Sequence, residues 1–137
     1  MEIIDRDIGS ELMRRWGVAG WDDPGAEYVL WNDACIFALV QQDGFVDIHM
    51  AMDASKRHEC RKAGAEILNL VGHLKLRAVI LKDRPGVCNY ASRMGFGGKA
   101  IQKLTTTDGS ESSFFVMWRE PGEYDGRSNQ RFRCCSK

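Results

Sequence analysis

Four cations and a serine follow a strand-like segment in the first half of the chain. Residues 44–52, GFVDIHMAM, alternate between two faces as a strand does, and SKRHECRK comes just after them. A helix is expected from about Ser55 to Leu74, because apolar residues recur there at spacings of three and four. The N-terminus of a helix offers unbonded N–H groups and a partial positive charge, which both favour an anion.

Two interpretations of this helix start remain open. Ser55, Lys56, Arg57 and Arg61 would lie in its first turns, where each cation opposes the helix dipole by roughly a few tenths of a kcal/mol. The four side chains would therefore hold a phosphate group, or they belong to a solvated basic helix start. The segment has no glycine, so its Cβ atoms keep the backbone away from a ligand and any phosphate is held by side chains.

Two titratable residues precede this segment on one face of the strand. Asp47 and His49 are two positions apart, so both side chains point to the same side. Either could serve as a general base, and the alternative is a half-exposed strand face that tolerates polar residues. Cys88 would be a nucleophile if Arg84, one turn earlier, lowered its pKa, or else a small core residue.

Composition sets broad limits. The chain has 137 residues, 19 basic and 19 acidic, so the zero net charge disfavours a protein that coats nucleic acid. Five cysteines without a CxxC pair favour reduced thiols, and apart from His58 and Cys60 no spacing suits a metal. We find no signal peptide and no apolar run near the roughly 20 residues of a membrane span. The expected location is the cytoplasm.

Hydrophobic patterns and turn residues divide the rest of the chain. Expected elements are an N-terminal helix capped by Ser10 and ended by Gly17, a second helix between Pro85 and Gly95, and several strands. The strands are expected at 27–33, 34–42, 44–52 and 76–82, then in GGKAIQKLTTT and SSFFVMWRE around a turn at 107–110. Residues 1–120 would form one domain and 121–137 a flexible tail. The fold class is α/β (α+β), with a mixed, mostly antiparallel sheet, flanking helices and a central βαβ crossover.

This order, with Met94-Gly95-Phe96 closing the second helix, resembles the GNAT acyltransferase superfamily over residues 27–119. The resemblance implies acetyl-CoA as co-substrate and an amine as acceptor. It also implies that CoA lies along the strand end, at Met50 and Met52, and on SKRHECRK (residues 55–62), called the basic segment below. Arg84 stands where the family opens its second helix with Asn.

The family's proton-donating Tyr would fall at Ala91, and Tyr90 stands one residue earlier. The chain looks most like small phage-encoded GNAT-like proteins, some of them internal virion proteins. Two functions stay open: an acetyltransferase, or a catalytically inactive GNAT-fold protein that acts in a virion or on a host protein, in the host cytoplasm. A homodimer could form if SSFFVMW were an exposed edge strand.

Overall fold

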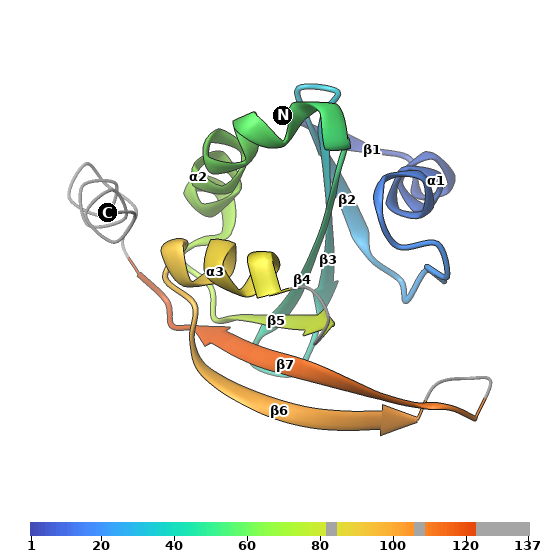
Figure 1. Ribbon diagram of the computed structural model, residues 1–137. Coiled ribbons are helices and arrows are strands. Elements are labelled where there is room, and N and C mark those ends of the chain that lie inside the picture. The colour runs from blue at the N-terminus through green and yellow to red at the C-terminus, as the bar shows by residue number, and fades with distance from the viewer. Residues whose placement is uncertain (82–84, 106–108, 123–137) are drawn as a thin grey trace. The chain divides into compact units, whose positions relative to one another are not determined.

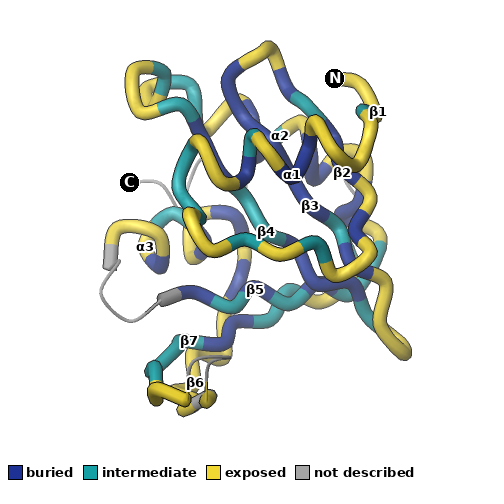
Figure 2. Tube along the Cα trace, turned by 90° about the vertical axis from the view of Figure 1, so that its right-hand side faces the viewer, coloured by how far each residue is buried: buried dark blue, intermediate teal, exposed yellow. Residues whose placement is uncertain are grey.

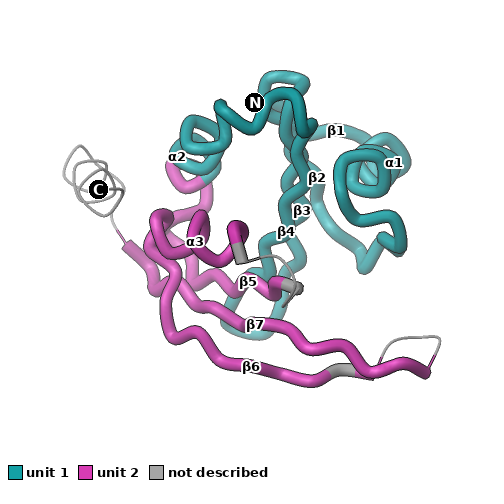
Figure 3. The backbone as a smooth tube through the Cα atoms, in the orientation of Figure 1, with its two compact units in different colours: residues 1–67 teal, residues 68–137 magenta. Residues whose placement is uncertain are grey.

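The computed structural model describes residues 1–81, 85–105 and 109–122 (Figure 1). The chain divides into two compact units, residues 1–67 and the residues from Leu68 onward (Figure 3). Within the described residues there are seven strands and three α-helices, and the ladders described below are antiparallel. This is the predicted mixed α/β class with mostly antiparallel strands. The predicted flexible tail lies almost wholly outside the described residues.

The first unit is a four-stranded antiparallel arrangement in the order β1-β2-β3-β4, with one helix before β2. Its elements are β1 (Glu2–Ile4), α1 (Arg6–Trp16), β2 (Glu27–Trp31), β3 (Cys35–Gln41) and β4 (Val46–Met52). The β2–β3 hairpin turns at Asn32 and Asp33, whose φ angles of 51° and 48° are left-handed. Two such residues suit the twist of a tight hairpin, so the predicted turn is confirmed.

The strands of the first unit bury both faces (Figures 1 and 2). On one face α1 packs over a cluster of Met13, Ala26, Tyr28, Ile36, Ala38, Val40 and Ala51. On the other face Trp31 donates a hydrogen bond from Nε1 to the carboxylate of Glu66 in α2 (Cys60–Val71). Ala63 and Ile67, on the buried stripe of α2, are fully inaccessible to solvent. The predicted amphipathic helix therefore covers this second face.

Two local expectations for the first unit were wrong, and one strand was missed. The helix α1 begins at Arg6 under the cap Asp5, while Ser10 is buried and bonds to the hydroxyl of Tyr28 at 3.0 Å. Strand β1 was missed because it has only three residues. The helix expected from Ser55 begins as the 3-10 helix η1 (Ala54–Glu59), and regular α-helix starts at Cys60.

The second unit contains β5 (Leu76–Leu81), α3 (Pro85–Arg93), β6 (Gly97–Thr105) and β7 (Glu111–Arg119). Its strand order is β5-β7-β6, and both ladders are antiparallel. The segment SSFFVMW thus lies in the middle strand β7, so its prediction as an edge was wrong and β6 is the outer strand. The helix α3 contacts β5 and buries Cys88 and Ala91.

The end of α3 is held by one arginine. Arg119 donates from Nε to the Met94 carbonyl at 2.9 Å and from Nη1 to the Gly72 carbonyl at 3.1 Å. Gly95 follows with a φ of 93°, and a Cβ there would come within 3.2 Å of Arg119 Nε. The predicted glycine stop is confirmed, and the left-handed conformation favours glycine there because other side chains would be strained.

The chain order β4, α2, β5 is the strand–helix–strand order that a βαβ crossover requires. Among the residues described, no helix is long and apolar enough to cross a membrane.

Candidate active site

The two candidate bases lie on the face of β4 that α1 covers. In the β3–β4 register His49 stands opposite Ala38 and Asp47 opposite Val40, both members of the α1 core. The predicted shared face is thereby confirmed. Asp47 is buried and accepts a hydrogen bond from Gln42 Nε2 at 3.0 Å. A buried carboxylate needs such a donor, so its position is fixed by the turn that precedes β4.

His49 is half-buried against Trp21, from the loop between α1 and β2. The two ring centroids are 5.1 Å apart with an interplanar angle of 65°, an edge-to-face contact. Trp21 is itself fixed, because its Nε1 donates to the Tyr28 hydroxyl at 3.0 Å. The imidazole of His49 is therefore oriented by an aromatic ring that a buried tyrosine holds.

Tyr28 is the centre of this polar network. Its hydroxyl donates to Asp23 Oδ1 at 2.7 Å, and Asp23 also accepts from the backbone N–H groups of Gly25 and Ala26. The Tyr28 hydroxyl, then these N–H groups and Arg6, lower the pKa of Asp23. Burial raises the pKa of Tyr28. Asp23 thus stays a carboxylate that ties the loop 17–26 to β2.

Met50 and Met52 point to the opposite face of β4. Met50 is half-buried opposite Phe37, and Met52 is buried opposite Cys35. The register runs one-to-one from Val46 to Met52, so β4 contains no bulge along β3.

Asp53 shapes the basic segment. Its carboxylate accepts from the Ser55 backbone N–H at 3.0 Å and from the Ser55 hydroxyl at 2.9 Å. These bonds, the Ser55 hydroxyl first, lower the pKa of Asp53. The turn closes with Lys56 N–H bonded to the Asp53 carbonyl, and Lys56 departs from helical geometry with φ −117° and ψ 16°. The N–H and hydroxyl of Ser55, which the sequence analysis offered to a bound phosphate, therefore donate to the carboxylate of Asp53 instead.

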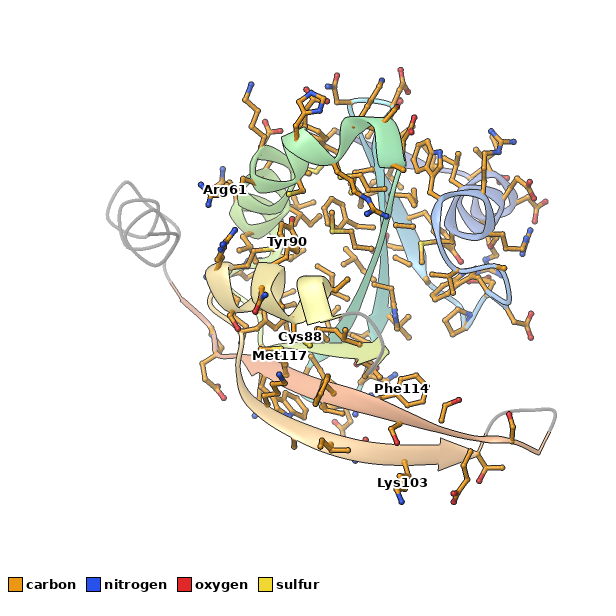
Figure 4. All side chains as sticks on the ribbon, in the orientation of Figure 1. Arg61, Cys88, Tyr90, Lys103, Phe114 and Met117 are labelled. Carbon is orange, nitrogen blue, oxygen red and sulfur yellow. The ribbon has the colours of Figure 1, made fainter. Side chains whose placement is uncertain are left out.

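The cationic side chains surround this 3-10 turn. Ser55 and Arg57 are exposed, Lys56 is half-exposed, and Arg61 is exposed on the second residue of α2. In Figure 4, Arg61 extends away from the helix. The four residues are brought together on one short stretch, but around η1 rather than around the first turn of a long α-helix.

A pair of cysteines lies beneath this turn. Cys35 is inaccessible to solvent, and Cys60 is the first residue of α2. Burial raises the pKa of the Cys35 thiol, and the nearby Cys60 raises it further. Cys35 is therefore a core thiol and no nucleophile at neutral pH.

The remaining candidates belong to the second unit. Tyr90 is half-buried in α3, and its carbonyl accepts from Met94 N–H at 3.2 Å. Ala91 is buried, with 5% of its surface exposed, and Cys88 is also buried. Arg84 lies outside the described residues. Among the residues described, no three His, Cys, Asp or Glu side chains form a group that could hold a metal ion.

Sequence reasoning missed Trp21 and Gln42, the two side chains that contact the candidate bases. The available signal was a tryptophan within the turn GWDDPG, where a large aromatic has little reason to lie unless it packs on something.

Comparison with known proteins defines the class of fold. No protein-family model matches the chain, and no curated protein matches it in sequence. Solved structures do match in shape. The ribosomal-protein-S18-alanine N-acetyltransferase of Escherichia coli is 13% identical with a TM-score of 0.62, over 91% of this chain and 95% of that one.

Two further structures agree. A Bacillus subtilis acetyltransferase in complex with CoA gives a TM-score of 0.62 at 14% identity, over 87% of this chain and 96% of that one. A Bacteroides thetaiotaomicron protein assigned to the GNAT family gives 0.63 at 12% identity, over 97% and 93%. This chain has the fold of the GNAT acetyltransferases. At these identities the likeness shows the fold alone.

Proposed function

We propose that this protein is an N-acetyltransferase that moves an acetyl group from acetyl-CoA to an amine. The observation that carries the proposal is the fold, which solved GNAT acetyltransferases share over 87–97% of the chain. One of those proteins was solved with CoA. The location proposed with this function is the cytoplasm, or the host cytoplasm if a phage encodes the chain.

The basic segment is the proposed site of the CoA pyrophosphate. Lys56, Arg57 and Arg61 supply three cations within a short stretch that is largely exposed. Ser55 would add a hydroxyl only after releasing its bond to Asp53. Hydrogen bonds from cations to phosphate oxygens are about twice as strong as neutral ones. Such bonds would offset the absence of glycine in the loop. Arg84 is assigned to the same role from the sequence alone.

Met50 and Met52 are the proposed lining for the pantetheine arm of CoA. They follow each other on the face of β4 away from α1, immediately before the basic segment. Thioether side chains adapt to irregular ligands, which suits this role.

In the proposed reaction, the acceptor amine loses a proton and its nitrogen attacks the thioester carbonyl carbon. The carbon–sulfur bond then breaks, and the CoA sulfur leaves and takes a proton. Asp47 or His49 is the proposed base, and the hydroxyl of Tyr90 the proposed donor to sulfur. Gln42 and Trp21 hold the two candidate bases in fixed orientations, as catalysis by positioning requires.

An assay of CoA thiol release with acetyl-CoA and a panel of amines tests this proposal. The panel should contain a polyamine, an aminoglycoside and a peptide with a free N-terminus. Replacing the true base, by Asp47→Asn or His49→Gln, should lower kcat by about 10²- to 10⁴-fold. His73→Gln, at an exposed position just after α2, is the matched control and should leave the rate unchanged. Thiol release that neither substitution affects would contradict the assignment of the base.

A second function, a catalytically inactive GNAT-fold protein, is favoured by specific observations. Ala91 is buried where the family has its proton-donating Tyr, and Asp53 takes a donor proposed for phosphate. Such a protein would act through its surface, as a phage virion component or on a host protein. It would bind no acetyl-CoA, which separates the two functions.

A further inference from the structure

The outer strand of the second unit presents an open edge. In the order β5-β7-β6, strand β6 pairs only with β7 among the described strands. All of its residues with a described burial are exposed, as the yellow tube in Figure 2 shows. From Ala100 to Thr105 the pairing with β7 is one-to-one, so the backbone groups of this stretch that face away from β7 form a regular row. Such a row is a template for one more strand.

A bulge precedes this regular stretch of β6. The register shifts between Gly97 and Ala100, and Gly98 has a φ of 64°, a left-handed conformation that glycine adopts without strain. The usable edge therefore has a defined start, near Lys99, and at least six paired residues beyond it.

The side chains of β6 form a basic and apolar stripe. Lys99, Ile101 and Lys103 alternate along the strand, and Ile101 stands opposite Phe115 of β7. Lys99 Nζ lies 4.2 Å from the Phe115 ring centroid, which puts both residues on the same face. Ile101 is 58% exposed, and Lys103 extends away from β7 in Figure 4. The stripe thus combines two cations with one unprotected apolar side chain.

We propose that the edge of β6 binds an extended acidic segment of another protein as an added strand. The segment would place carboxylates beside Lys99 and Lys103 and an apolar side chain beside Ile101, while its backbone pairs with the open edge. Opposite charges on neighbouring strands are favourable, and main-chain hydrogen bonds supply sequence-independent affinity. No acidic residue lies within β6.

Charge disfavours two other occupants, a second copy of β6 and the chain's own C-terminal residues. In an antiparallel pair of two β6 strands centred on Ile101, Lys99 of each copy would face Lys103 of the other, and like charges placed opposite are destabilising. Lysines on an edge oppose such self-pairing. The chain's own residues 123–137 contain three arginines and one lysine against one glutamate and one aspartate, so their net charge has the same sign as this stripe. A foreign acidic strand remains as the complementary partner.

A labelled synthetic peptide tests the proposal on the full-length protein. The probe is a capped peptide with the core Glu-Thr-Val-Thr-Glu, measured by fluorescence anisotropy at low salt. Lys99→Glu combined with Lys103→Glu should weaken its binding by about tenfold, because two attractive cross-strand pairs become repulsive. A peptide with the core Lys-Thr-Val-Thr-Lys should bind this double variant instead. Arg15→Glu with Lys62→Glu, both exposed in the first unit, is the matched charge control.

A second probe separates strand addition from simple charge attraction. The same acidic peptide with alternate backbone amides N-methylated keeps its carboxylates but cannot pair with an edge, so it should bind at least about tenfold more weakly. Equal binding of the methylated peptide, or equal binding by the charge-reversed variant, would overturn the proposal. The oligomeric state gives a further test. If the wild type sediments as a dimer and Ile101→Lys sediments as a monomer, a second copy occupies the edge and the proposal is overturned.

Discussion

Strands β4 and β6 both carry polar side chains among apolar ones, yet they differ completely in exposure. Every residue of β4 is buried or half-buried, whereas every residue of β6 with a described burial is exposed. The polar residues of β4 must therefore find protein partners, and Gln42 and Trp21 fix Asp47 and His49 in place. The polar residues of β6 meet solvent and remain available to a partner. Fixed groups suit catalysis, while an open edge suits recognition.

The packing of α1 on Tyr28 in the first unit can be disrupted by a substitution at one glycine. A Cβ on Gly9 of α1 would lie 2.3 Å from Cγ of Tyr28, a residue with 1% of its surface exposed. We expect Gly9→Ala to destabilise the fold by about 2–3 kcal/mol, because overpacking at this contact exceeds the gain in helix propensity. Urea unfolding monitored by circular dichroism measures the change.

Gly86 in α3 is the matched control in the second unit, since nothing lies within 4 Å of a Cβ there. Gly86→Ala should stabilise the protein by about 0.5–1 kcal/mol through helix propensity. Equal effects at the two glycines would contradict the described packing of α1 on Tyr28.

The second unit should depend on Arg119 as the first depends on Tyr28. Replacing Arg119 by Leu removes the donors to the carbonyls of Met94 and Gly72. We expect a loss of about 2 kcal/mol in unfolding free energy, in the range for hydrogen bonds to charged groups. Arg119→Lys keeps the charge but not the planar fork, and should recover only part of it. Full recovery with Lys would mean that charge alone matters there.

Among the three destabilising substitutions, the one in the polar network behind His49 should lower the unfolding free energy least. Tyr28→Phe removes a hydroxyl that bonds to Ser10, Trp21 and Asp23, at a cost of about 1 kcal/mol. The difference between variant and wild type should narrow as the solution is acidified. The pKa of Asp23 is lowered in the folded protein, so its stabilisation is present above its unfolded pKa and is lost as pH falls through the folded value. A difference that stays constant with pH would contradict this coupling.

Local signals predicted much of the fold. The turn at Asn32-Asp33, the helix between Pro85 and Gly95 and the two faces of β4 each depend on a few neighbouring residues, and the structure confirms them. The wrong predictions concern features that are set by contacts between residues far apart in the sequence. Ser10 was predicted as a cap, but its hydroxyl bonds to Tyr28, eighteen residues away. The outer position of β6 depends on strand pairing, which alternation along a single strand does not encode.

The candidate site was predictable in its residue types rather than in its surroundings. The spacing of Asp47 and His49 put them on one face, which the structure confirms. Their contacts with Gln42 and Trp21 come from loops, where no periodicity guides a prediction. The basic segment was found, but η1 was not, because Asp53 competes for the donors of Ser55 through its side chain.

Isothermal calorimetry of acetyl-CoA binding tests the central claim most directly. The wild type should bind, and Arg57→Ala with Arg61→Ala should weaken binding by at least about tenfold, since each hydrogen bond from a charged group contributes roughly 1.5–3 kcal/mol. Both side chains are exposed on η1 and α2, so the unfolding free energy should hardly change. A wild type that binds no acetyl-CoA at millimolar concentration, or a double variant that binds as well as the wild type, would contradict the account.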